Sequence, residues 1–268
     1  RARLNGLAVF SKRKAAQKAY QLFCNPYRHA RRKNPRIFQK GEPLSFPLQG
    51  IRIKGFRFNH PSPQKVLILH GFESTCLKFD RYIQPLIRKG YEVLAFDAPA
   101  HGMSEGRQIT LPLYISMLKK IQDLYGPIDR YMAHSFGGLA LTLFLEQQPS
   151  VPSTRMVLIA PATETVTAID SFFRLLHLDE KIRKAFDELI LQKSGFPASH
   201  FSIARALPGV AATVLWIHDE DDELTPLSDA LRIKEKQLPH LQFSITKGLG
   251  HRKIYRDNQV AKQIIDFL

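Results

Sequence analysis

Short runs of apolar residues recur along the chain after residue 50, separated by longer stretches in which apolar residues repeat at helical spacing. Uninterrupted apolar runs of this length indicate strands buried on both faces, whereas alternation of apolar and polar residues indicates half-buried strands. By these criteria strands are predicted at about residues 51–58, 66–69, 91–96, 130–134, 156–159, 214–217 and, as an edge strand, 241–245. Helices are predicted at about residues 77–88, 111–124, 139–146 and 260–268. Strands that alternate with helices in this way predict an α/β fold, in which helices cover both faces of a mostly parallel, doubly wound sheet.

One connection between predicted strands is much longer than the others. More than fifty residues separate the strand ending at Ile159 from the strand starting at Val214, which is too long for a single crossover. The stretch has helical periodicity over much of its length and is rich in phenylalanine. We therefore expect one domain over residues 41–268, with a small helical cap inserted at about residues 162–208.

The length and composition fit one large globular domain. The chain has 268 residues, of which 44% are hydrophobic, and can bury a sizeable core. No apolar run approaches the roughly 18 residues of a membrane-spanning helix, and the run at residues 7–10 is too short for a signal peptide. The two cysteines, Cys24 and Cys76, lack the spacing of a disulfide framework or a metal site. These features favour a soluble protein of the cytoplasm.

Positive charge is concentrated at the beginning of the chain. Residues 1–36 contain eleven Lys and Arg and no Asp or Glu, so only +4 of the formal net charge of +15 remains for residues 37–268 (15 − 11). Apolar residues at helical spacing between Leu4 and Phe23 predict a basic N-terminal helical extension over residues 1–40. We expect this helix to dock on the rest of the protein with its charged face in water. The alternative is a weak contact with an anionic membrane surface; nucleic acid is not an expected partner.

A serine stands where a predicted strand passes into a predicted helix. Ser135 has small residues, Ala133 and Gly137, two positions before it and two after it. A nucleophilic serine on a sharp strand-to-helix turn needs such neighbours, because strand and helix pass close together there. The alternative is a serine that caps the helix N-terminus, where serine is favoured. The segment by itself fits both interpretations.

Other residues that acyl transfer requires follow the ends of other predicted strands. His251 comes after the last strand, in a Gly-rich turn, and can be the base that activates a serine hydroxyl. The backbone N–H groups of Phe72, after an earlier strand, and of Phe136, directly after the serine, stand where an oxyanion hole needs donors. The carboxylate that would orient the imidazole lies in the acidic run from Asp219 to Glu223, which leaves several candidates.

Five motifs, in this order along the chain, resemble those of the α/β-hydrolase family, and in particular of bacterial esterase- and lipase-like serine hydrolases. They are His70 to Phe72, Asp97 to Ser104, Ala133 to Gly138, His218 to Pro226 and Gly248 to His251. The resemblance covers about residues 50–268 and implies the α/β-hydrolase fold.

The resemblance also implies roles for individual residues. Ser135 would be the nucleophile and His251 the base, with Phe72 and Phe136 as oxyanion-hole donors. In the family the catalytic aspartate lies four residues after a strand-end histidine and four before a proline, a spacing that selects Asp222. The chain departs from the family pattern at Asp219, where glycine is usual, so Asp219 stays a second candidate for the acid.

These observations predict a carboxylesterase-like serine hydrolase that cleaves a small-molecule carboxylic ester, or a thioester or amide, through an acyl-enzyme on Ser135. An acyltransferase or a cofactor-free haloperoxidase would use the same triad, and a non-catalytic ligand-binding member of the fold would keep the site without turnover. No cofactor is implied. No metal is expected either, because the strand-end histidines lack the short spacing of metal ligands. These histidines are His70, His101, His134 and His218.

Overall fold

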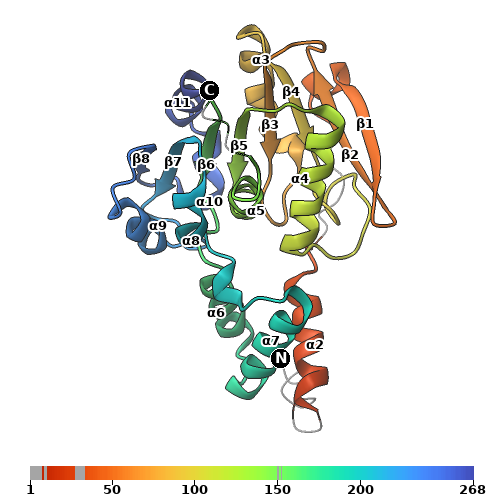
Figure 1. The fold of residues 1–268 in the computed structure, drawn as a ribbon, viewed down its shortest axis with the longest axis vertical. Coiled ribbons are helices and arrows are strands. Elements are labelled where there is room, and N and C mark those ends of the chain that lie inside the picture. Colours follow the sequence, from red (N-terminus) through yellow and green to blue (C-terminus); the bar gives the residue numbers. More distant parts are fainter. Residues whose placement is uncertain (1–7, 9–10, 28–33, 150, 152) are drawn as a thin grey trace.

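The computed structural model describes residues 8, 11–27, 34–149, 151 and 153–268, and its centre is one eight-stranded sheet (Figure 1). The strands lie in the order β1-β2-β4-β3-β5-β6-β7-β8. They are β1 Glu42–Leu48, β2 Ile51–Phe58, β3 Lys65–Leu69, β4 Glu92–Phe96, β5 Arg130–His134, β6 Arg155–Ile159, β7 Thr213–Asp219 and β8 Leu241–Thr246. Strands β3 to β8 run parallel, and β2 pairs antiparallel with both β1 and β4. The prediction of a mostly parallel sheet is confirmed.

Strand β1 was not predicted from the hydrophobic pattern. It contains Pro43 and Pro47, and proline cannot donate to a β-ladder, so a segment with two prolines does not have the sequence of a central strand. The structure places β1 at the edge of the sheet, where proline is tolerated. Gln49 and Gly50 join β1 to β2 with φ angles of 45° and 81°, which suit a two-residue hairpin turn.

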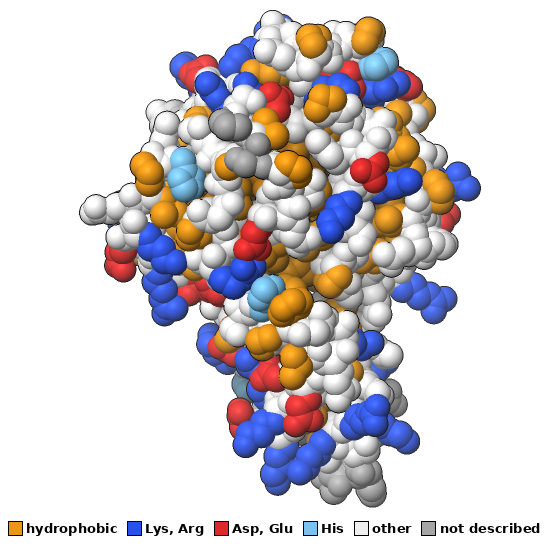
Figure 2. All heavy atoms as spheres, in the orientation of Figure 1, with side chains coloured by type: hydrophobic (Ala, Val, Ile, Leu, Met, Phe, Trp, Pro, Cys, Tyr) orange, Lys and Arg blue, Asp and Glu red, His pale blue; other side chains and the backbone are white. Residues whose placement is uncertain are grey.

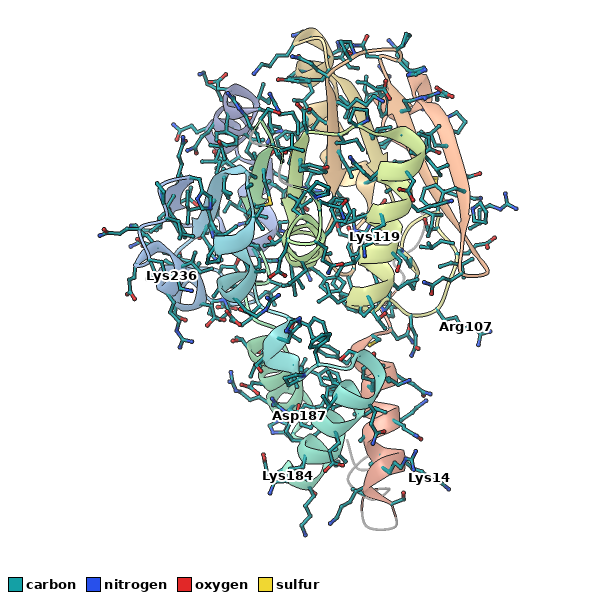
Figure 3. The ribbon with its side chains drawn as sticks, viewed as in Figure 1. Lys14, Arg107, Lys119, Lys184, Asp187 and Lys236 are labelled. Atoms are coloured by element: carbon teal, nitrogen blue, oxygen red, sulfur yellow. The ribbon has the colours of Figure 1, made fainter. Side chains whose placement is uncertain are left out.

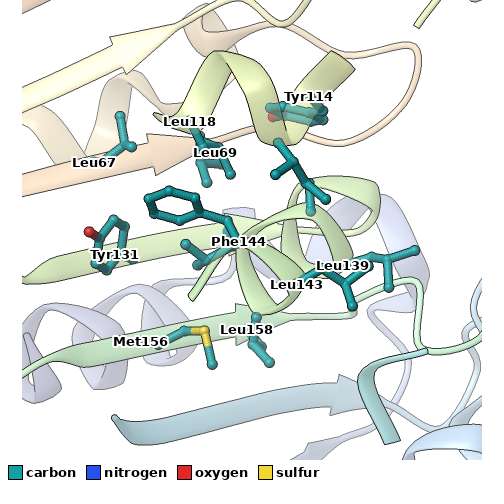
Figure 4. Packing of buried hydrophobic residues seen from close by; sticks show 14 of the residues in the cluster. Leu67, Leu69, Tyr114, Leu118, Tyr131, Leu139, Leu143, Phe144, Met156 and Leu158 are labelled. Atoms are coloured by element: carbon teal, nitrogen blue, oxygen red, sulfur yellow. The ribbon is translucent and has the colours of Figure 1, made fainter. Parts of the chain in front are cut away.

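Helices cover both faces of the sheet. The helices of the main domain are α3 Asp80–Arg88, α4 Leu111–Tyr125, α5 Phe136–Leu145, α9 Leu227–Lys234, α10 Gly250–Lys253 and α11 Asn258–Phe267, with 3-10 turns η1 Arg36–Lys40, η2 Cys76–Phe79 and η5 Ile254–Arg256. Helices α4, α5 and α9 share one apolar core with Leu67 and Leu69 of β3, the core seen in Figure 4. Helices α3 and α11 share the other core with Val66 and Ile68 of the same strand. Because successive strand residues point to opposite faces, an uninterrupted apolar strand supplies both cores.

Helix boundaries differ from the sequence prediction in three places. Helix α5 begins at Phe136, directly after Ser135, and not at residue 139. Helix α9 was not predicted; only three of its eight residues are buried, so its apolar face is short. His251 lies in the short helix α10 and not in an open turn.

The long connection between β6 and β7 forms a separate group of helices, seen at the lower end of the molecule in Figure 1. The elements of this group are α6 Thr165–Leu176, α7 Glu180–Ser194 and η3 Ala198–His200. The connection then returns to the main domain through α8 Ile203–Ala206 and η4 Leu207–Gly209, whose buried residues belong to the core shared by α4, α5 and α9. Helices α6 and α7 have an apolar core of their own, which includes Phe173 and Phe186. Arg183 of α7 pairs with Asp170 of α6 and with Asp187 of its own helix, and so ties the two helices together. We call these helices the cap.

The N-terminal helix α2, Lys12–Phe23, packs on the cap and mainly on α7, not on the sheet (Figure 1). Its inward face includes Ala15, Ala16 and Ala19, which are buried in the cap core, and Tyr20 and Phe23, whose rings pack on Phe186. Residues 1–7, 9–10 and 28–33 of the predicted extension lie outside the described residues, and the domain boundaries stay predictions. None of the described helices has both the length and the apolar character needed to cross a membrane.

Candidate active site

Ser135 occupies a strained turn between β5 and α5. Its φ of 54° and ψ of −124° lie in a region that only glycine adopts readily. The side chain makes no capping hydrogen bond to α5, so the helix-capping interpretation does not apply. Two glycines permit the turn: a Cβ at Gly71 would lie 2.6 Å from the Cβ of Ser135, and a Cβ at Gly137 would lie 2.7 Å from the carbonyl oxygen of His70. The turn that carries Ser135 therefore leaves no room for a side chain at either glycine.

Three residues from distant parts of the chain form one line of hydrogen bonds. His251 Nε2 lies 3.0 Å from Ser135 Oγ, and His251 Nδ1 lies 2.8 Å from Asp222 Oδ2. Because the carboxylate can only accept, Nδ1 carries the imidazole proton and Nε2 is left to accept the proton of the serine hydroxyl. Little of the three groups is exposed to solvent. Ser135 is 8% exposed, Asp222 is 6% exposed, and the side chain of His251 is 9% exposed.

Asp219, the second candidate acid, lies on the same side of the sheet but binds the backbone. Its carboxylate accepts hydrogen bonds from the N–H groups of Leu249 and Gly250, at 3.1 and 2.8 Å, and from the Thr246 hydroxyl at 2.6 Å. It therefore holds the first turn of α10, the helix that carries His251. Burial alone would raise the pKa of Asp219, but these hydrogen bonds outweigh it and hold the pKa below its usual range.

Asp222 is oriented by Thr225, a residue that the sequence analysis did not single out. The Thr225 hydroxyl lies 2.8 Å from Asp222 Oδ2, and the Thr225 N–H lies 2.9 Å from Asp222 Oδ1. Burial alone would raise the pKa of Asp222, but bonding to His251 and Thr225 outweighs it and holds the pKa below its usual range. The carboxylate thus stays ionised beside the imidazole. The sequence signal for this contact is the position of Thr225 three residues after Asp222, because an aspartate side chain can accept from a backbone N–H at that spacing.

The two residues expected to supply the oxyanion donors contact each other through their side chains. Within the described part of the chain, the N–H groups of Phe72 and Phe136 make no hydrogen bond, so both can bind an added oxygen atom. The Phe136 N–H is at the first position of α5, where the helix dipole favours negative charge. The two phenylalanine rings meet edge to face, with centroids 6.4 Å apart, and Phe72 packs in the same way on His101.

The remaining strand-end histidines bind the backbone. His70 Nε2 accepts from the Ala98 N–H at 2.9 Å, and His101 Nε2 accepts from the Glu73 N–H at 3.0 Å. Burial lowers the pKa of His70 to about 4 and that of His101 to about 3, so both rings are neutral at neutral pH. Among the described residues, no group of three or more potential metal ligands comes together.

His134, the residue before the serine, supports the imidazole of His251 from behind. His134 Nε2 lies 3.0 Å from the carbonyl oxygen of His251, which can only accept, so Nε2 is the donor. The two rings also pack together, with centroids 4.6 Å apart, and the Tyr255 ring packs on His134 with centroids 4.7 Å apart. Burial, and repulsion between the two rings when both are protonated, hold the pKa of His134 well below its usual range. No sequence signal beyond adjacency to Ser135 indicates this role.

Comparisons with known proteins agree with this architecture. The chain is 23% identical to the Bacillus subtilis protein YqkD over 249 residues, which are 86% of this chain and 81% of that one. It is 25% identical over 236 residues to a lysophosphatidylserine lipase, ABHD12, of Danio rerio, a match that covers 80% of this chain and 60% of that protein.

Solved structures share the fold at lower sequence identity. The Pyrococcus furiosus esterase Pf2001 has a TM-score of 0.67 and 20% identity, over 91% of this chain and 97% of that one. Est1E of Butyrivibrio proteoclasticus, solved with ferulic acid, has a TM-score of 0.63 and 17% identity, over 84% of this chain and 97% of that one. The family model described as serine aminopeptidase, S33, matches residues 60–194, half of the chain. The chain therefore belongs to this family of hydrolases and has the α/β-hydrolase fold.

Proposed function

We propose that the protein is a serine hydrolase that cleaves a carboxylic ester through an acyl-enzyme on Ser135. One observation carries the proposal: a serine in strained backbone geometry is hydrogen-bonded to an imidazole, which is hydrogen-bonded to a buried carboxylate. This combination lets a hydroxyl that is a poor nucleophile at its normal pKa lose its proton as it attacks. Thioesters and amides have the same carbonyl chemistry and are the neighbouring substrate classes.

In the proposed mechanism Ser135 Oγ attacks the ester carbonyl carbon while His251 Nε2 takes its proton. The carbonyl oxygen becomes an oxyanion and accepts hydrogen bonds from the N–H groups of Phe72 and Phe136. His251 then gives the proton to the leaving alcohol, and the acyl group stays on the serine. Water attacks this acyl-enzyme with His251 again as base, which releases the carboxylic acid and restores the serine. Asp222 stabilises the imidazolium in both halves.

An ester with an apolar acyl or alcohol part is the substrate class that we favour. Apolar side chains are exposed beside the triad: Phe72 is 37% exposed, and Leu224, two residues after Asp222, is 56% exposed. Similar solved structures include esterases, and the Danio rerio relative is a lipase for lysophosphatidylserine. A lipid-like ester is therefore consistent with the family and with these residues.

The proposal is tested by labelling with a fluorophosphonate probe. Wild type should be labelled and Ser135→Ala should not, whereas Ser116→Ala, a serine on the outer part of α4, should be labelled like wild type. Label that persists on Ser135→Ala would remove this residue as nucleophile. Hydrolysis of p-nitrophenyl esters of increasing chain length, compared with p-nitroanilides of the same acids, then separates ester from amide hydrolysis and measures the acyl preference.

A further inference from the structure

The outward face of α2 is positively charged. Because its three buried alanines lie against the cap, the basic side chains of the helix remain exposed. These are Lys12, Arg13, Lys14 and Lys18. The helix contains no Asp or Glu, and none of the four forms an ion pair within the described part of the chain. Lys14 projects from the end of the cap that is farthest from the sheet, and Lys184 of α7 projects from the same end (Figure 3).

A groove of about 450 Å³ lies between α2, α7 and the loop before α4. Arg13 and Lys193 contribute a cation each, four glutamine side chains contribute amides, and Tyr20 and Leu189 complete the lining. No carboxylate lines it among the described residues. The Lys193 ammonium lies 5.5 Å from the centre of the Tyr20 ring and has no ion-pair partner within the described residues. Amide N–H groups and unpaired cations in one groove are suited to a phosphate group.

The distribution of charge indicates an extended anionic partner and not a single small anion. Exposed cations continue along α2 beyond the groove, whereas the face of the cap seen in Figure 2 carries both basic and acidic side chains. The sequence adds further Lys and Arg to either side of α2, with no acidic residue in positions 1–36. Two exposed leucines, Leu22 of α2 and Leu191 of α7, belong to the same helices. Cations and exposed apolar side chains on the same two helices fit a lipid interface better than the phosphodiester backbone of a nucleic acid.

We propose that the face of the cap formed by α2 and the last turns of α7 docks on a membrane that carries anionic phospholipids, with a headgroup phosphate in the groove between Arg13 and Lys193. The cap is inserted after β6, the strand beside β5, and Ser135 directly follows β5. This docking is independent of the proposed ester hydrolysis.

The experiment is co-sedimentation of the full chain with vesicles of phosphatidylcholine alone and of phosphatidylcholine mixed with phosphatidylserine. Binding should occur to the mixed vesicles only. It should weaken strongly between about 0.1 M and about 1 M NaCl, where the Debye length falls from about 10 Å to about 3 Å. One basic residue near such a surface strengthens binding about fivefold. The triple variant Lys12→Glu, Lys14→Glu, Lys18→Glu should therefore bind at least about 100-fold more weakly than wild type.

The matched control is Lys40→Glu, Lys54→Glu, Lys119→Glu, which changes the net charge equally on exposed residues outside the cap. It should keep most of the binding. Thermal melting followed by circular dichroism checks that the variants stay folded. A second triple variant, Lys12→Gln, Lys14→Gln, Lys18→Gln, removes the same charges without reversing them and tests whether charge reversal itself causes unfolding.

Equal loss of binding in the α2 variant and the control would overturn the proposal, because it would show dependence on net charge alone. Binding of inorganic phosphate or of a duplex oligonucleotide without binding of mixed vesicles would also overturn it. The sedimentation is repeated with Ser135→Ala. Because vesicle binding needs no turnover, Ser135→Ala should bind vesicles like wild type. A wild-type protein that binds vesicles but hydrolyses no ester would refute the proposed function and leave the docking surface supported.

Discussion

At the residue scale, the two aspartates of one loop have different structural positions although they are three residues apart. Asp222 faces the imidazole of His251, whereas Asp219 faces the backbone of α10. The acidic run in the sequence does not distinguish them, because both follow the same strand end. Only the direction of each side chain separates an imidazole partner from a loop anchor.

Substitution of these aspartates should separate the two roles. Asp222→Asn should lower kcat about 10⁴-fold, because an amide favours the wrong imidazole tautomer and cannot stabilise the imidazolium. Asp219→Asn should lower kcat far less and lower the melting temperature instead, since it weakens the charged anchor of α10. Steady-state kinetics on a p-nitrophenyl ester and thermal melts measure both effects. A larger kcat loss for Asp219→Asn would move the acid role to that residue.

His134 should act as a positioning residue for His251. Two variants separate its hydrogen bond to His251 from its ring packing. His134→Phe keeps a ring to pack on His251 but removes the donor to the His251 carbonyl; His134→Gln keeps a donor and removes the ring. Loss of a buried hydrogen-bond partner costs about 1–3 kcal/mol. If that bond orients the imidazole, His134→Phe should lower kcat about tenfold or more with little change in KM, and His134→Gln should retain more activity. Equal losses in both variants, matched by equal losses in melting temperature, would indicate packing alone.

At the scale of elements, the docking of α2 on the cap is the arrangement that the sequence did not define. The periodicity predicted a helix, but the partner surface depends on residues more than 150 positions later in the chain. Alanines at the contact let two helices lie close together, and they also weaken the apolar signal of α2. The long phenylalanine-rich insertion, in contrast, was recognisable because its length exceeds that of any ordinary crossover.

A charge placed in this contact should disrupt it. Ala19 is fully buried between α2 and the cap helices, so Ala19→Glu would bury an unpaired carboxylate and should destabilise the cap by several kcal/mol. The control Gln17→Glu adds the same charge on the exposed side of α2 and should be near neutral. Limited proteolysis should cleave the Ala19→Glu protein within residues 160–210 faster than the control. Equal cleavage rates would mean that α2 contributes nothing to the order of the cap.

At the scale of the whole molecule, several buried neutral histidines couple stability to pH. The pKa values of His70 and His101 are lowered by burial to about 4 and about 3, and those of His134 and His218 are also lowered, mainly by burial. In the unfolded chain these groups have pKa values near 6.5. As the pH falls below about 6.5, the unfolded state therefore binds protons that the folded state does not, and stability decreases.

The free energy of unfolding should accordingly fall between pH 7 and pH 5, by up to about 1.4 kcal/mol per pH unit for each such histidine. Urea titrations at several pH values measure this slope. His101→Gln is the informative variant, because glutamine can donate to the Pro99 carbonyl and accept from the Glu73 N–H but cannot titrate. Its slope should be smaller than that of wild type. An unchanged slope would mean that His101 does not contribute to the pH dependence.

The sequence by itself determined the class of fold and the order of most strands and helices, and it predicted the helical insertion and the candidate serine, histidine and oxyanion-hole residues. These follow from local rules: apolar periodicity reports burial, and residues that end parallel strands gather at one edge of the sheet. The tertiary structure decided which aspartate faces His251, that Thr225 and His134 support the site, and that α2 belongs with the cap. Each of these depends on side-chain directions and contacts between segments far apart in the chain, for which a single sequence has no periodic signal.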